Sequence, residues 1–223
     1  MNIEASRQSQ ASTKTHILDV AERLFADYGL EAVSVRDITK TAKTSLGAIN
    51  YYFGAKHGLI AAIFDRRLTP VTRARLAALD AVEKAAGKKR PPVEDILRAF
   101  IVPAFSKEGE NRNTTFRKMM GRCLAEPNRK IERMFHAPFQ DLAQRFDGAL
   151  LKARPDLTRA EVFWRMSVII AALHHALLLV ERAIPLPPDM QDVSLDEHKV
   201  VERLVTYGAA IMRAPRPEKP SNP

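Results

Sequence analysis

Cysteine and glycine are both scarce in this sequence, with one cysteine, Cys123, and nine glycines in 223 residues. A single cysteine cannot form an internal disulfide, so we expect a reducing, cytoplasmic compartment. A sheet-rich fold of this length needs more glycines in its turns, so the shortage favours helices. Residues 1–12 contain no apolar core of a signal peptide. The longest apolar stretch, near residues 166–180, is interrupted by one serine and two histidines, so we expect no membrane span.

Patterns that support enzyme chemistry are also missing. We find no paired carboxylates, no metal-ligand spacing, no glycine-rich phosphate loop and no nucleophile–base pair. His174 and His175 are adjacent and point to different faces of a helix, so they lack the spacing of a metal pair. Cys123 has no evident chemical partner, and we expect it to be a small buried apolar residue. The sequence therefore predicts no catalytic site, no metal site and no cofactor, and the chain is not expected to be an enzyme.

Helix-forming residues and positive charge are what the sequence has instead. Hydrophobic residues make up 46% and charged residues 27%, which suits a soluble protein with a substantial core. Leu, Ala, Arg and Glu abound, which favours an all-α fold. The formal charge of +9 favours a polyanionic partner without requiring one. Seven cations minus six carboxylates leave residues 1–60 at only +1, so most of the surplus lies elsewhere.

Three predicted helices open the chain. Thr13 is expected to cap the first, whose apolar residues recur at helical spacing until Gly29 ends it. Ser34 and Asp37 resemble a capping box that opens a short second helix. Ser45 is expected to cap a short third helix. Two short helices joined by a tight turn and packed on a longer one form a helix-turn-helix.

The rest of the chain is predicted as helices separated by prolines. A long helix starts at Lys56, and Pro70 is expected to kink or break it. The segment GKKRPP at residues 87–92 interrupts the helical pattern. Residues 214–223 are proline-rich and predicted to be disordered, as is the polar tail over residues 1–12. Further helices are expected near residues 93–106, 114–126, 128–153, 158–183 and 195–213.

A helix-turn-helix places its second short helix in the major groove of double-stranded DNA. The small side chains of Ser45 and Gly47 would let this helix approach closely, and the Tyr51 hydroxyl could reach a phosphate. The candidate DNA-binding residues are Arg36, Ser45, Leu46, Gly47, Ala48, Asn50, Tyr51, Tyr52 and Lys56. A structural interpretation stays open, because short helix pairs are common in helical proteins. Phe53 fits that interpretation better, and we assign it to the core.

The segment AKTSLGAINYYFGAK at residues 42–56 resembles the recognition segment of TetR-family transcriptional regulators, whose usual form is AGVSxGxLYxHFxSK. ILDVAERLFADYG at residues 17–29 also resembles that family. The resemblance implies an all-α homodimeric repressor with two recognition helices roughly 34–36 Å apart on a palindromic operator. A small-molecule effector would change that spacing and release the DNA.

The implied domains are a three-helix DNA-binding domain over residues 13–58 and a larger ligand-binding and dimerisation domain over residues 59–213. The segments INYYF at residues 49–53 and EVFWRM at residues 161–166 are similar to a subgroup that includes fatty-acid-responsive repressors.

Four of the departures from the usual family form concern the turn, the expected contacts and the cap of the next helix. Lys43 stands where a turn glycine is usual, and a left-handed residue other than glycine costs roughly 1 kcal/mol. Asn50 replaces a common tyrosine, Tyr52 a common histidine, and Ala55 a common serine cap. Lys43 and the nearly neutral N-terminal segment motivate an alternative function, a small-molecule-binding helical protein without sequence-specific DNA readout.

The helix predicted over residues 158–183 is apolar around much of its circumference, and such a helix is buried on both sides. With the family resemblance, this helix and the last one are expected to form the homodimer interface; an ordinary monomer core is the alternative. The middle helices are expected to hold a hydrophobic effector, although each apolar residue there is more often plain core. The candidate ligand-binding residues are Phe100, Phe105, Met119, Cys123, Phe135, Phe139 and Trp164.

Overall fold

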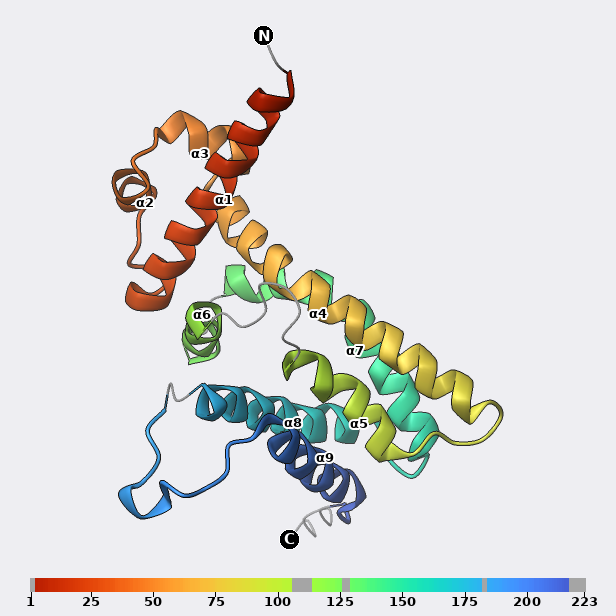
Figure 1. The fold of residues 1–223 in the computed structure, drawn as a ribbon. Helices are drawn as coiled ribbons and strands as arrows, with labels where there is room; N and C mark the ends of the chain where they lie inside the picture. The colour runs from red at the N-terminus through yellow and green to blue at the C-terminus, as the bar shows by residue number, and fades with distance from the viewer. Residues whose placement is uncertain (1–2, 106–113, 126–128, 182–183, 217–223) are drawn as a thin grey trace, which may run out of the picture. The chain divides into compact units, whose positions relative to one another are not determined.

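The computed structural model describes residues 3–105, 114–125, 129–181 and 184–216, and in these ranges the regular structure is helical throughout (Figure 1). The all-α prediction is therefore confirmed. The α-helices are α1 (Ile3–Tyr28), α2 (Val35–Thr41), α3 (Leu46–Phe53), α4 (Lys56–Ala86), α5 (Val93–Ile101), α6 (Thr114–Ala125), α7 (Arg129–Ala153), α8 (Arg159–Val180) and α9 (Glu197–Arg213). Two short 3-10 helices, η1 (Val102–Phe105) and η2 (Pro188–Met190), complete the set.

Two predictions about helix ends and breaks differ from the structure. α1 begins at Ile3, so residues 3–12 are helical and Thr13 is not its cap. This segment contains neither glycine nor proline, so nothing in it stops a helix from extending. α4 also runs through Pro70 without a break, while the alternative of a kink there stays a prediction. Apolar residues on both sides of Pro70 are packed into cores, which offsets the lost hydrogen bond.

The chain divides into two packing units, and α4 contributes to both. The first unit comprises Met1–Pro70 and Asn113–His136, and the second comprises Val71–Arg112 and Ala137–Pro223. Each has its own apolar core. The domain boundary expected between residues 58 and 59 stays a prediction. By packing, α6 and the part of α4 up to Pro70 belong to the same unit as the N-terminal helices.

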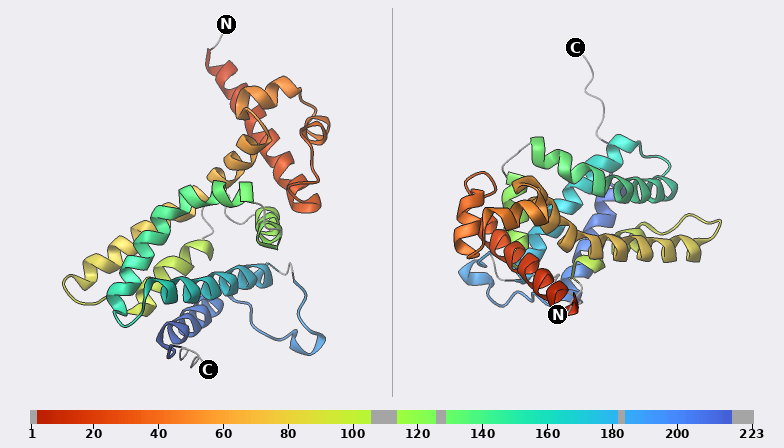
Figure 2. Two further views of the ribbon diagram at one scale, coloured as in Figure 1. Left: turned by 180° about the vertical axis from the view of Figure 1, so that it is seen from behind. Right: turned by 90° about the horizontal axis from the view of Figure 1, so that it is seen from above.

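The core of the first unit joins α1, α2, α3, α4 and α6, and α2 and α3 lie beside one another (Figure 2). Ile17 and Phe25 of α1, Ile38 of α2 and Ile49 of α3 are all fully buried. Met119 of α6 is also fully buried in this core. The helix pair α2–α3 therefore shares one apolar core with α1, α4 and α6.

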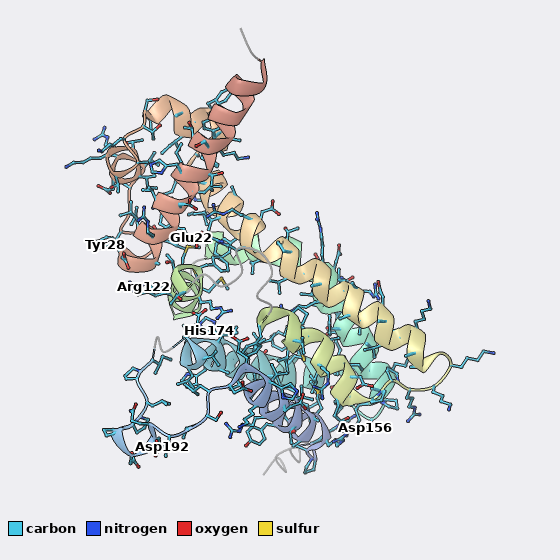
Figure 3. All side chains as sticks on the ribbon, in the orientation of Figure 1. Glu22, Tyr28, Arg122, Asp156, His174 and Asp192 are labelled. Carbon is cyan, nitrogen blue, oxygen red and sulfur yellow. The ribbon has the colours of Figure 1, made fainter. Side chains whose placement is uncertain are left out.

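A buried ion cluster adds a polar tie between α1 and α4. Glu22 is 1% exposed, and its Oε2 accepts hydrogen bonds from Arg66 Nη2 at 2.7 Å and from Arg67 Nε at 3.0 Å. Arg66 also donates to Asp19 Oδ1 at 2.8 Å. Figure 3 shows Glu22 on the side of α1 that faces this part of α4. The cluster fixes how α4 lies along α1.

In the second unit, α9 lies against both α5 and α8 (Figure 2). A Cβ added at Gly208 of α9 would lie 3.1 Å from Leu97 Cδ1 of α5, so these helices approach closely. Arg98 and Glu202 form an ion pair between the same two helices. Arg165 of α8 is buried and donates to the carbonyl of Ile211 at 2.6 Å, which ties α8 to the end of α9.

We expect Gly58→Ala to destabilise the protein by roughly 1–3 kcal/mol. A Cβ at Gly58 would lie 1.9 Å from the carbonyl oxygen of Phe53, so α3 or α4 would have to move. Chemical denaturation measures the change in the free energy of unfolding.

Gly148→Ala is the matched control, because it lies inside α7 and its added Cβ would meet nothing within 4 Å. We expect this substitution to stabilise the protein by about 0.5–1 kcal/mol, since alanine is a better helix former. Equal effects of the two alanine substitutions would contradict the close approach of α3 and α4.

Candidate nucleic-acid interface

The capping box predicted at the start of α2 is confirmed. The backbone N–H of Ser34 donates to Asp37 Oδ2 at 2.8 Å, and the backbone N–H of Asp37 donates to Ser34 Oγ at 3.2 Å. Hydrogen bonds from Ser34 lower the pKa of Asp37 below its ordinary value. The cap therefore contributes stability above the ordinary aspartate pKa and loses it as the pH falls through the lowered value.

The turn between α2 and α3 keeps a left-handed residue although that residue is a lysine. Lys43 has φ of 49°, and the next backbone N–H, of Thr44, donates to the carbonyl of Thr39 at 3.0 Å. Ser45 then caps α3 as predicted, because its Oγ accepts from the N–H of Ala48 at 3.1 Å. The turn therefore has the geometry that a glycine usually provides, at the cost of backbone strain.

The inner side of α3 is apolar and buried. Ile49 is 0% exposed and Phe53 is 8% exposed, so the assignment of Phe53 to the core is confirmed. Gly54 ends the helix with φ of 71°, a conformation that suits glycine. These contacts fix which side of α3 faces away from the protein.

The outer side of α3 carries most of the predicted DNA-binding residues. Tyr51 is 74% exposed and Leu46 is 52% exposed, while Ser45, Gly47 and Asn50 are also exposed. Ala48 and Tyr52 are half-buried against the core, so they contribute less surface than predicted. The rings of Tyr51 and Tyr52 meet edge to face, with centroids 5.0 Å apart.

The segment that contains α2 and α3 carries net positive charge. Residues 34–58 contain four cations and one carboxylate, which gives +3, and the carboxylate is that of Asp37 in the capping box. Arg36, Lys40 and Lys43 are exposed. Lys56 is half-buried, and its Nζ lies 3.4 Å from the carbonyl oxygen of Glu31. The sequence prediction did not include Lys40 and Lys43 among the DNA-binding residues, although their positive charge beside the predicted third helix could have indicated them.

Three of the six carboxylates of residues 1–60 lie on α1 and are paired there, whereas Glu31 lies between α1 and α2. Asp19 and Glu22 bind Arg66, and Asp27 accepts from Lys118 Nζ at 3.1 Å. Residues 1–33 have three cations and five carboxylates, which gives −2, so the near-neutral sum for residues 1–60 averages an acidic first part with the +3 of the α2–α3 segment.

The predicted ligand-binding residues do not form one group. Phe100 and Phe105 lie together in the core of the second unit. Met119 belongs to the core of the first unit, and Cys123 packs against that core. Trp164 is 67% exposed on α8, so the structure does not place it in a buried pocket. The side chains of Phe135 and Phe139 lie outside the described residues.

Comparison with known proteins covers both parts of the chain. Residues 17–63 match the family described as bacterial regulatory proteins, tetR family. Residues 98–210 match the tetracyclin repressor-like C-terminal domain. The HTH-type transcriptional regulator AcrR of Shigella flexneri is 38% identical over 60 residues, which cover 27% of this chain and 28% of AcrR.

Two further similarities agree with these matches. The A-factor receptor protein of Streptomyces griseus is 33% identical over 67 residues, 30% of this chain and 24% of that protein. This chain thus spans about a quarter of the length of these two curated relatives. The crystal structure of a transcriptional regulator of the TerR/AcrR family from Aquifex aeolicus VF5 matches 89% of this chain and 99% of its own, with a TM-score of 0.53 and 22% identity. That likeness concerns the fold.

We expect Lys43→Gly to be more stable than Lys43→Ala by about 1 kcal/mol, because only glycine adopts φ of 49° without strain. Both substitutions remove the same charge, so the comparison isolates the backbone. Thermal and chemical unfolding of the two variants measure the difference. If alanine is tolerated as well as glycine, the turn does not hold a strained left-handed residue.

Proposed function

Because the chain belongs to the TetR family of bacterial regulatory proteins, we propose that it is a ligand-responsive transcriptional repressor that binds a palindromic operator as a homodimer. The observation that carries this proposal is the exposed side of α3, with Tyr51 at its centre and a +3 segment around it. The family is one of regulatory proteins, which agrees with the expectation that the chain is not an enzyme.

In the proposed complex, α3 enters the major groove with its N-terminus first. Ser45 and Gly47 leave room for a close approach, and Leu46 can contact a thymine methyl group. Asn50 is exposed and can bond base edges, while the Tyr51 hydroxyl reaches a phosphate oxygen.

Cations on either side of α3 are proposed to bind the phosphate backbone. Arg36, Lys40 and Lys43 are exposed on α2 and in the turn. Lys56 begins α4, whose N-terminal amides also favour a phosphate. Because each neutralised phosphate releases counterions, binding should weaken steeply as salt is raised.

The homodimer is proposed to form through α8 and α9. One face of α8 packs into the core through Val162, Met166 and Ile169, whereas Trp164 is 67% and Val168 is 53% exposed. An exposed apolar patch of this kind marks an interaction surface. A second copy of α8 and α9 would cover it and set the spacing of the two α3 helices.

Of the described helices, α8 is the one whose length and composition would allow it to cross a membrane, and 39% of its most apolar window is buried. We propose that the rest of this helix is covered by the partner subunit and that the protein is cytoplasmic.

Release of the operator is proposed to follow from effector binding in the second unit. An effector that binds more tightly to the dimer with the wrong α3 spacing shifts the population away from the DNA-binding state. The alternative function without DNA readout rested on Lys43 and on the near-neutral charge of residues 1–60. The left-handed turn at Lys43 and the +3 charge of residues 34–58 both favour DNA binding instead.

Selection from a random DNA pool should enrich a palindrome, and Tyr51→Ala should weaken binding to it at least about tenfold. The dimer would lose two hydrogen bonds to charged phosphate oxygens. Fluorescence anisotropy at fixed salt measures the dissociation constant.

Tyr28→Ala is the matched control, because Tyr28 is 64% exposed in the same unit at the far end of α1 (Figure 3). We expect it to bind the operator normally. If no palindrome is enriched, or if the two tyrosine variants behave alike, the proposed function is wrong.

Val168→Glu should weaken the dimer at least about 100-fold, because an isologous interface would place the unpaired charge at two symmetric positions. Analytical ultracentrifugation measures the dissociation constant of the dimer. Met190→Glu changes an equally exposed apolar residue in η2 and should leave the dimer intact. A wild-type protein that stays monomeric at micromolar concentration would rule out this interface.

A further inference from the structure

An arginine from the second half of α4 is set into the aromatic core of the second unit. The Nε–H of Arg75 donates to the carbonyl oxygen of Phe100 at 2.8 Å, and its guanidinium carbon lies 3.9 Å from the centroid of the Phe100 ring. Phe100 in turn meets Phe146 of α7 edge to face, with centroids 5.2 Å apart. Arg75 is half-buried, so part of its surface stays accessible to solvent.

Arg75 differs from most arginines of the second unit whose contacts are described. Six of those arginines bind carboxylates, and the exposed Arg203 donates to the carbonyl of Ser194. Arg75 is half-buried, and its described contacts are a backbone carbonyl and an aromatic ring. The carboxylate-bound arginines of this unit are Arg98 with Glu202, Arg145 with Asp80 and Glu83, Arg154 with Asp156, Arg159 with Asp147, Arg165 with Glu161, and Arg213 with Glu94.

The charge of Arg75 is held at an energetic cost. Burial lowers the pKa of Arg75 to about 10, so the side chain is still protonated at neutral pH. The bond to Phe100 satisfies a carbonyl near the end of α5, which gives the residue a structural role. That role uses one of its five N–H donors. A methionine or leucine would fill such a core without the cost of burying a charge.

We propose that Arg75 binds the anionic headgroup of the effector, and that the effector is a carboxylate with an apolar body lying next to Phe100. The planar fork of a guanidinium matches a carboxylate through two parallel hydrogen bonds. One arginine balances the single negative charge of a carboxylate, whereas a phosphate dianion would bring a second negative charge that Arg75 alone does not balance. This inference rests on the proposed effector function and changes the expected ligand from purely hydrophobic to amphipathic.

The test is isothermal titration of the full chain without DNA. Octanoate and 4-phenylbutyrate are the probes, and octanamide and 4-phenylbutyramide are their neutral counterparts. At least one carboxylate should bind the wild type, and its amide should bind at least tenfold more weakly. Arg75→Met should lose carboxylate binding at least tenfold, and Arg75→Lys should show a smaller loss, because it keeps the charge without the fork.

Arg73→Met is the matched control, since Arg73 is exposed on the same helix and should not affect carboxylate binding. The proposal is overturned if neither carboxylate binds, if the amides bind equally well, or if Arg75→Met binds like the wild type. If Arg75→Met does not fold, NMR titration of the wild-type protein tests the proposal instead. The Nε–H resonance of Arg75 should shift when the carboxylate is added and stay in place when the amide is added. A resonance that does not shift with the carboxylate overturns the proposal.

The titration contains no DNA, so it separates this inference from the proposed function. Carboxylate binding through Arg75 in a protein that selects no palindrome would uphold the inference and refute the repressor. A protein that selects a palindrome but binds no carboxylate would uphold the repressor function and refute the inference about Arg75.

Discussion

A buried carboxylate fixes α4 against α1, and the position of the proposed DNA-reading helix depends on it. Glu22 is held by Arg66 and Arg67, and a buried charge that loses its partners costs about 3–5 kcal/mol. α4 cannot slide along α1 without breaking these bonds. At its N-terminal end α4 meets α3 so closely that Gly58 has no room for a Cβ beside Phe53. Together the two contacts hold the exposed side of α3 in one orientation.

Local signals in the sequence predicted the helix pair, because the interacting residues are three or four positions apart. The caps at Ser34 and Ser45 and the inward position of Phe53 are of this kind. Contacts between distant residues could not be predicted in the same way. Glu22 and Arg66 are 44 positions apart, and nothing in their spacing links them. Pro70 shows the converse, since packing on both sides of it overrides a local helix-breaking preference.

Candidate residues for an effector site were harder to predict, because apolar character does not say which core a residue joins. Met119 lies in the core of the first unit, whereas Trp164 faces away from the core of the second. The candidate ligand-binding residues were chosen for their apolar character, so the charged Arg75 was not among them. Its proposed role depends on the residues around it, and these are known only from the fold. The exposed α8 face and Arg75 thus give the second unit two proposed tasks, dimerisation and effector binding.

The central claim is that two α3 helices of one dimer read two halves of a DNA site. Hydroxyl-radical footprinting on the selected DNA tests it most directly. We predict two protected blocks on one face of the duplex, related by a two-fold axis and centred about one helical turn or a multiple of it apart. Protection of a single block, or protection spread evenly along the DNA, would contradict the account.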